Sequence, residues 1–216
     1  NNLKKIKFII FVNTKTKHLF TNDKSMNLVF ATNNLHKLRE VENILCNRIK
    51  LLSLKDINCF EEIPEEQDTI QGNASQKANF IYQKYKINCF ADDTGLEISA
   101  LHGRPGVFSA RYAGENCSFE DNIAKVLAEL KGKEEREARF RTVISLILNG
   151  EERQFEGIVN GIILKVKKGR EGFGYDPIFQ PLGYNTSFAE MPPEVKNRIS
   201  HRAMAVKLMA KYLDLL

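Results

Sequence analysis

Long apolar runs are what this sequence of 216 residues most clearly lacks. The one apolar run among the first 26 residues, at 6–12, is interrupted by Lys7. It falls far short of the roughly 20 apolar residues that a membrane-spanning helix needs. No small-residue cleavage pattern follows it, so a secretory signal is not expected either. We therefore expect a cytoplasmic protein without a membrane partner.

Cysteine is also scarce and irregularly placed. The four cysteines form no CxxC pair and no cluster with metal-ligand spacing, so we expect free thiols in a reducing compartment. Internal repeats and low-complexity linkers are missing from the body of the chain. Hydrophobic residues make up 43% and charged residues 27%. These values are typical of a globular protein with one large domain or two small lobes that share a cleft.

Positive charge is concentrated at the start of the chain. The formal net charge is +5, and residues 1–24 contain six lysines and one acid, so the rest carries 26 basic and 26 acidic residues. A neutral body argues against a nucleic-acid partner. We expect residues 1–26 to form a lysine-rich, poorly ordered extension, with an organelle-targeting segment as the alternative, and residues 27–216 to form one domain of two lobes.

Short apolar runs alternate with amphipathic stretches along the body. Asn149-Gly150 joins two long runs and is a signal for a hairpin. Strands are predicted at 28–31, 49–54, 88–91, 140–148 and 154–166, and helices at 38–45, 73–86, 119–130 and 193–213. Helices mixed with both adjacent and separated strands predict an α/β fold with a mixed sheet.

Two adjacent acids, Asp92 and Asp93, follow directly after the predicted strand 88–91. Like charges at that place need a cation or hydrogen-bond donors to compensate them. Carboxylates suit Mg²⁺, which binds through one or two of them together with substrate phosphates. The pattern favours a metal site or catalysis, with a plain acidic turn as the alternative, and the acids within 61–68 offer a further ligand.

A second polar segment lies where the first predicted strand opens into a helix, at Thr32-Asn33-Asn34. Unpaired backbone N–H groups and the helix dipole favour an anion at such a helix start. Lys37 lies one turn later and adds a positive charge. The segment is therefore a candidate for binding phosphate, although a lysine at this place is usually solvated.

Two further segments carry groups suited to a nucleotide base. In residues 172–177 glycines bracket Phe173, whose ring offers a stacking face. Ser200 predicts the cap of a helix whose first turn contains His201 and Arg202. Cations at a helix N-terminus are electrostatically unfavourable, so we expect these two side chains to serve a ligand.

Five ordered motifs together resemble one known family. They are Ala31-Thr32-x-Asn34-x-x-Lys37 and residues 91–96, 105–112, 172–179 and 200–203. This set resembles the inosine/xanthosine triphosphate pyrophosphatases, the Ham family, over about residues 27–213. The resemblance implies hydrolysis of ITP, dITP and XTP to monophosphate and pyrophosphate, with Mg²⁺ or a substituting Mn²⁺. It also implies a homodimer, and an elongated mixed sheet with flanking helices and two lobes around a central nucleotide cleft.

The resemblance assigns roles to the matching positions. Asp93 is implied to be the general base and a metal ligand, with Asp92 beside it as a further metal residue. The triphosphate would be held by Thr32, Asn34 and Lys37, and Lys37 would share the phosphate charge during catalysis. Thr94 stands where the family often has Ser and keeps the substrate-binding hydroxyl. The base pocket would consist of Phe173, Gly174, Tyr175, Asp176, Lys196, His201 and Arg202.

Three positions depart from the family's pattern. Asn33 replaces a usual Gly, so this turn is expected to need an uncommon backbone angle. Gly72 replaces the first residue of a Glu-Asn-Ala motif. The metal-binding Glu aligns with Glu65, with Glu66 as the alternative. Two other functions stay open: a pyrophosphatase for modified pyrimidine nucleotides, and a nucleotide-binding sensor without turnover.

Overall fold

The computed structural model describes residues 26–45 and 49–214. Within them one seven-stranded sheet has the order β2-β1-β3-β5-β6-β7, and β4 pairs with β3. The strands are β1 (Met26–Phe30), β2 (Ile49–Leu52), β3 (Cys89–Ile98), β4 (Pro105–Gly106), β5 (Glu137–Leu148), β6 (Glu151–Ile163) and β7 (Phe179–Pro181). The α-helices are α1 (Leu35–Leu45), α2 (Ile70–Tyr85), α3 (Phe119–Glu129), α4 (Pro193–Ile199) and α5 (His201–Tyr212).

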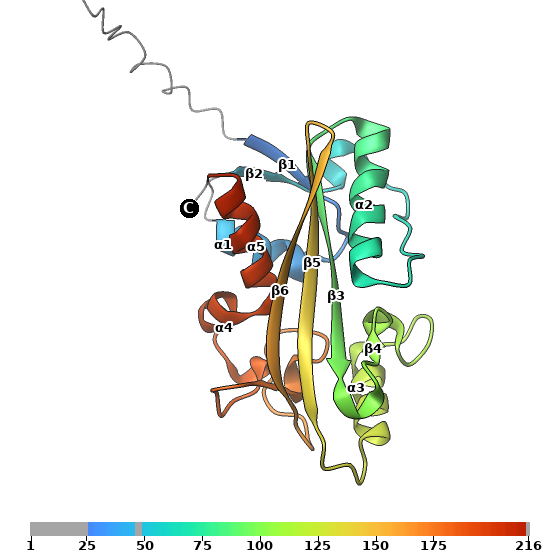
Figure 1. Ribbon diagram of the computed structural model, residues 1–216, viewed down its shortest axis with the longest axis vertical. Helices are drawn as coiled ribbons and strands as arrows, with labels where there is room; N and C mark the ends of the chain where they lie inside the picture. Colours follow the sequence, from blue (N-terminus) through green and yellow to red (C-terminus); the bar gives the residue numbers. More distant parts are fainter. Residues whose placement is uncertain (1–25, 46–48, 215–216) are drawn as a thin grey trace, which may run out of the picture.

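The sheet is mixed and long. β1 pairs in parallel with β2 and β3, whereas the pairs from β3 through β5 and β6 to β7 are antiparallel. β3, β5 and β6 run along the long axis of the molecule, with α2 and α5 on opposite sides of them (Figure 1). The prediction of an elongated α/β fold with a mixed sheet and flanking helices is confirmed.

Side chains alternate between the two faces of the sheet, as the pleat requires. Along β1, Leu28 and Phe30 pack in a cluster with the apolar residues of α1 and α5. Val29 and Ala31 belong instead to the cluster that contains the buried side of α2. Two cores therefore lie on opposite faces of this end of the sheet, and the direction of each side chain follows from its place in the strand.

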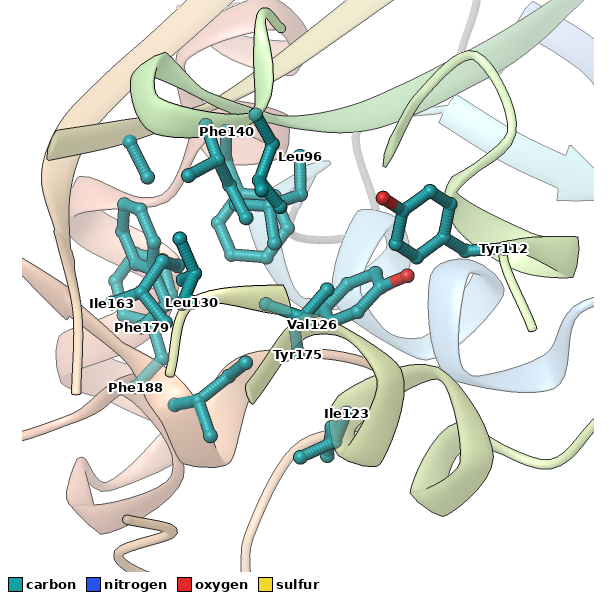
Figure 2. Packing of buried hydrophobic residues seen from close by; sticks show 14 of the residues in the cluster. Leu96, Tyr112, Ile123, Val126, Leu130, Phe140, Ile163, Tyr175, Phe179 and Phe188 are labelled. Atoms are coloured by element: carbon teal, nitrogen blue, oxygen red, sulfur yellow. The ribbon is translucent and has the colours of Figure 1, made fainter. Parts of the chain in front are cut away.

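A third core occupies the other end of the sheet, where α3 packs. Phe140 of β5 lies against Phe179, with ring centroids 4.6 Å apart, and Phe179 lies against Phe188 at 5.2 Å. Ile123 and Val126 of α3 belong to the same cluster (Figure 2). The long strands thus carry separate cores at their two ends.

Two predicted boundaries are wrong in informative ways. The strand predicted at 88–91 continues through the acid pair to Ile98, because the buried carboxylates are compensated by cations and the ladder to β5 runs on. The single helix predicted at 193–213 is two helices with a break at Ser200. The predicted cap at Ser200 is confirmed, because its side chain accepts from the Ala203 N–H at the start of α5. The hairpin at Asn149-Gly150 is confirmed, with φ of 52° and 92°.

No helix in the described parts of the chain is long and apolar enough to cross a membrane. The predicted extension, residues 1–26, lies outside the described residues except for Met26, which begins β1. Its lack of order and the domain boundary at 27 stay predictions.

Gly157 of β6 offers a test of how closely α5 packs on the sheet. A Cβ at this position would lie 2.0 Å from the His201 carbonyl oxygen and 2.7 Å from the Ala205 nitrogen, both of them backbone atoms. Gly157→Ala should therefore lower the free energy of unfolding by about 3 kcal/mol in urea titrations, at the upper end of overpacking costs. Asn160→Ala, at an exposed position of the same strand, should change it by less than about 0.5 kcal/mol. Equal stability of the two variants would contradict this packing.

Candidate active site

The candidate site lies on β3, where this strand lacks a neighbour on one side. β1 pairs with it as far as Phe90, and β4 pairs with it only from Leu96 onward. Among the described residues, positions 92–95 therefore have β5 on one side and an open edge on the other. The alternation of side chains sends Asp92 toward α1 and α5, and Asp93 toward α2.

Asp92 is buried between two cations. Its Oδ1 lies 3.0 Å from Lys37 Nζ, and its Oδ2 lies 3.0 Å from Arg202 Nε. Burial alone would raise the pKa of Asp92, but Lys37 and Arg202 outweigh it and hold the pKa well below its usual range. Asp92 is therefore an ionised group whose charge is already satisfied within the protein. Burial lowers the pKa of Lys37 in turn, although Asp92 opposes the shift.

Asp93 faces α2 and has a different environment. Its Oδ1 lies 3.4 Å from Lys77 Nζ, and its Oδ2 accepts a long hydrogen bond of 3.5 Å from Asn73. Burial raises the pKa of Asp93, although the charges of Lys77 and Lys37 oppose the shift. The two neighbouring aspartates thus have pKa values moved in opposite directions, which is the pattern that separates a proton acceptor from a fixed charge.

Glu65 shares a cation with Asp93. The ammonium group of Lys77 pairs with both carboxylates, and this pairing, opposed by burial, lowers the pKa of Glu65. Glu65 lines the cavity described below, whereas Glu66 is exposed and its backbone N–H donates to Gln76. The described residues contain no group of three or more acidic, histidine or cysteine side chains gathered for a metal.

The loop between β1 and α1 is ordered by its own polar side chains. Asn34 Oδ1 accepts from the backbone N–H groups of His36 at 2.9 Å and Lys37 at 3.2 Å, so Asn34 caps α1. Thr32 Oγ1 accepts from the Asn34 N–H at 3.1 Å. The expected uncommon backbone angle at Asn33 is wrong, because Asn33 is not among the described residues with positive φ. The turn needs no glycine because these bonds hold it in ordinary geometry.

The glycine-rich segment is fixed by a buried ion pair. Asp176 Oδ2 accepts from the Phe173 N–H at 2.8 Å and lies 2.6 Å from Lys196 Nζ. Lys196 also pairs with Glu40 of α1 at 2.8 Å. Burial lowers the pKa of Lys196, but Asp176 and Glu40 outweigh it and raise the pKa above its usual value. A side chain at Gly172 would meet Asp176 Oδ2 at 2.1 Å, so this glycine is needed for the close approach.

Arg202 is 2% exposed, and its donors are engaged within the protein. Its Nη1 pairs with Glu40, its Nε with Asp92, and its Nη2 donates to Thr94 Oγ1 at 3.2 Å. These two carboxylates explain how a cation is tolerated in the first turn of α5. The charge at this helix start is therefore compensated within the protein, and electrostatics does not require Arg202 to serve a ligand, as the sequence argument assumed.

His201 is a buried, neutral ring. Burial, followed by the charges of Arg202 and Lys196, lowers its pKa well below 6.5. The ring stacks on Phe140 at a centroid distance of 4.5 Å. Its Nδ1 is buried and has no hydrogen-bond partner among the described residues. A buried polar atom without a partner is costly in a protein interior, so this atom is suited to meet a bound ligand.

One cavity of about 390 Å³ brings these groups together. This volume is within the range of small-molecule sites. Asp92 lies behind the lining, under Lys37 and Arg202. The predicted site residues that line the cavity are Thr32, Asn34, Lys37, Glu65, Asp93, Thr94, Phe173, Gly174, Tyr175, Asp176, Lys196, His201 and Arg202.

Three residues of the site were not predicted from the sequence. Asn73 and Lys77 lie four residues apart on the buried side of α2 and contact Asp93. Glu40 lies one turn after Lys37 on α1 and pairs with Lys196 and Arg202. The sequence signal that could have found such residues is a polar residue at helical spacing within an apolar stripe, as at Lys77 between Ala74 and Ala78.

Comparisons with known proteins show the family to which the chain belongs. The chain is 52% identical over 191 residues to a dITP/XTP pyrophosphatase of Flavobacterium johnsoniae, which covers 88% of this chain and 98% of that protein. It is 53% identical over 187 residues to one of Flavobacterium psychrophilum, with coverage of 87% and 98%. The structure of a HAM1 protein from Coxiella burnetii matches with a TM-score of 0.82 and 35% identity, covering 88% of this chain and 100% of that one. The profile of the Ham1 family matches residues 28–212, and the chain belongs to this family.

Proposed function

We propose that this protein hydrolyses the non-standard purine nucleoside triphosphates ITP, dITP and XTP to the monophosphate and pyrophosphate, and so cleanses the nucleotide pool. The observation that carries the proposal is the acid pair on β3, in which Asp92 is held by Lys37 and Arg202 while Asp93 lines a cavity of nucleotide size. The relatives described above are named for dITP and XTP, which supports the same substrate class.

Two chemically different groups of residues line the cavity. Lys37 and Lys77 lie near the acid pair and supply positive charge, and Thr32 and Asn34 lie at the start of α1. These residues suit a triphosphate. Phe173, in the glycine-rich segment, offers a ring for stacking and so suits a base.

The reaction is the attack of water on the α-phosphorus. The water oxygen forms a bond to this phosphorus, and the bond from the α-phosphorus to the bridging oxygen breaks, so pyrophosphate leaves with that oxygen. Asp93 accepts the proton that the water loses, because its carboxylate lines the cavity and is held only by long contacts, 3.4 Å to Lys77 Nζ and 3.5 Å to Asn73. Lys37 lies beside Asp92 and shares the charge of the phosphate oxygens.

Mg²⁺, or Mn²⁺ in its place, fits the carboxylates of Asp93 and Glu65. Both already pair with one ammonium group, that of Lys77, and Mg²⁺ binds proteins through one or two carboxylates while phosphates and water complete its shell. When bound, the ion supplies neutralisation of the phosphate oxygens. Asp92 is engaged by two cations, so we assign it an electrostatic role in holding Lys37 and Arg202.

Selectivity for a 6-oxo purine would rest on one donor that has no hydrogen-bond partner among the described residues. This donor is the Nδ1 atom of neutral His201, in the tautomer that carries the ring proton there. A 6-amino group, as in ATP, would place donor against donor and leave a buried group unpaired, which can lower kcat/KM by orders of magnitude. A homodimer and a cytoplasmic location are further parts of the proposal and rest on the family resemblance.

Pyrophosphate release should separate the substrates. With Mg²⁺ present, kcat/KM for ITP, XTP and dITP should exceed that for ATP and UTP by at least about 100-fold, because a site built to bond the 6-oxo group rejects analogues without it. Removal of the metal with EDTA should abolish release, and added Mg²⁺ should restore it. Equal activity on ITP and ATP would overturn the proposed specificity.

Asp93→Asn tests the proposed base. Loss of a general base typically costs a factor of about 100 to 10,000, so kcat for ITP should fall by at least about 100-fold while the fold is kept. Asp68→Asn is the matched control, because Asp68 is exposed just before α2 and does not line the cavity. Full activity of Asp93→Asn in steady-state assays would remove Asp93 from this role.

The pair Glu65→Gln and Glu66→Gln tests the proposed metal ligand. Glu65→Gln should raise the Mg²⁺ concentration needed for half-maximal activity, because one of two carboxylates is lost. Glu66→Gln, at the exposed neighbouring position, should leave the Mg²⁺ titration unchanged. The opposite order of the two variants would assign the ligand to Glu66.

A further inference from the structure

The ring of Phe173 is contacted by rings from two different helices. His36, in the first turn of α1, lies with its ring centroid 5.2 Å from that of Phe173 and with the two planes 22° apart. Phe119, the first residue of α3, lies 6.1 Å away and is tilted by 47°. Phe119 and Phe173 line the cavity, whereas His36 is outside its lining among the described residues. His36 therefore stacks on Phe173 without facing the cavity.

The backbone alone does not orient this ring. Glycines with positive φ flank Phe173 on both sides, and its N–H donates to Asp176, so the position of its Cα is set. Rotation of the side chain is then limited only by what touches the ring. Lys196 Nζ lies 5.0 Å and Arg202 Cζ lies 5.6 Å from the ring centroid, and both cations are held by Glu40.

We infer that His36 is a positioning residue for the base, acting through Phe173. This inference rests on the proposed function, in which a base stacks on Phe173. By stacking on the side away from the cavity, the imidazole keeps the phenyl ring in its binding orientation before the nucleotide arrives. A ring that is already ordered loses less conformational freedom when the base binds, so affinity rises without any new contact to the substrate.

The inference makes a specific kinetic prediction. An interaction made equally in the bound substrate and in the transition state changes KM and leaves kcat alone. An aromatic pair contributes enough for a change of about three- to tenfold. His36→Ala should therefore raise KM for ITP by about three- to tenfold with kcat within about twofold. His36→Phe, which keeps a ring, should restore KM.

A direct binding measurement separates the base from the phosphates. In calorimetric titrations, His36→Ala should bind IMP about three- to tenfold more weakly than the unchanged protein, whereas its affinity for inorganic pyrophosphate should be unaltered. Leu35→Ala is the matched control, because Leu35 is the exposed neighbour in the same turn of α1. This control should behave like the unchanged protein for both ligands.

The outcomes are distinguishable. The role of His36 would be overturned if KM in His36→Ala were unchanged or lowered, or if kcat fell by as much as kcat/KM. It would also be overturned if His36→Phe failed to restore KM, or if Leu35→Ala had an equal effect. Failure of the proposed function would appear differently, as a lack of preference for ITP over ATP in the unchanged protein measured in the same series.

Discussion

The buried charge of Asp92 is the constraint around which the site is arranged. A carboxylate taken out of water inside a strand is stable only when cations are paired with it, and here Lys37 and Arg202 are both within 3.0 Å. Arg202 in turn pairs with Glu40, and Glu40 with Lys196. This alternation of signs joins α1, β3, α5 and α4.

The chain of pairs has a mechanical consequence. The last pair of this chain is Lys196 with Asp176, and the Asp176 carboxylate also accepts a hydrogen bond from the Phe173 N–H. The proposed base platform and the proposed phosphate-binding residues are therefore connected through buried ion pairs. Removing one partner of such a pair leaves an uncompensated buried charge, so the members of the chain depend on one another. Asp93 lies on the opposite face of β3 and is outside this chain, which leaves it available for chemistry.

Much of the fold was predictable from local patterns. The apolar runs located the strands, the Asn149-Gly150 pair located the hairpin, and Ser200 located the start of α5. The length of β3 was not predictable, because two acids within a buried strand look like its end until their partners on α1, α2 and α5 are known. Those partners are distant in sequence, and only the folded chain brings them together.

The members of the candidate site were predictable, and the family resemblance implied different roles for the two aspartates, but the physical basis of that difference was not predictable. Ordered motifs indicated Asp92 and Asp93, yet a sequence cannot show that successive residues of one strand face different helices unless the strand is known to continue through them. Glu40 and Lys77 were missed for a related reason. Each looked like an ordinary charged residue on a helix. Whether such a residue belongs to a site depends on its burial, and burial depends on packing between elements that are distant in sequence.

The open edge of β3 between β1 and β4 also bears on how the protein avoids unwanted association. Unpaired strand edges are templates on which another chain can add a strand, and proteins protect them with charges that point inward or with short exposed lengths. Here the open stretch spans only positions 92–95, is bounded at both ends by paired strands, and carries two carboxylates. The short stretch of β3 that holds the two carboxylates is thus also a poor template for another polypeptide.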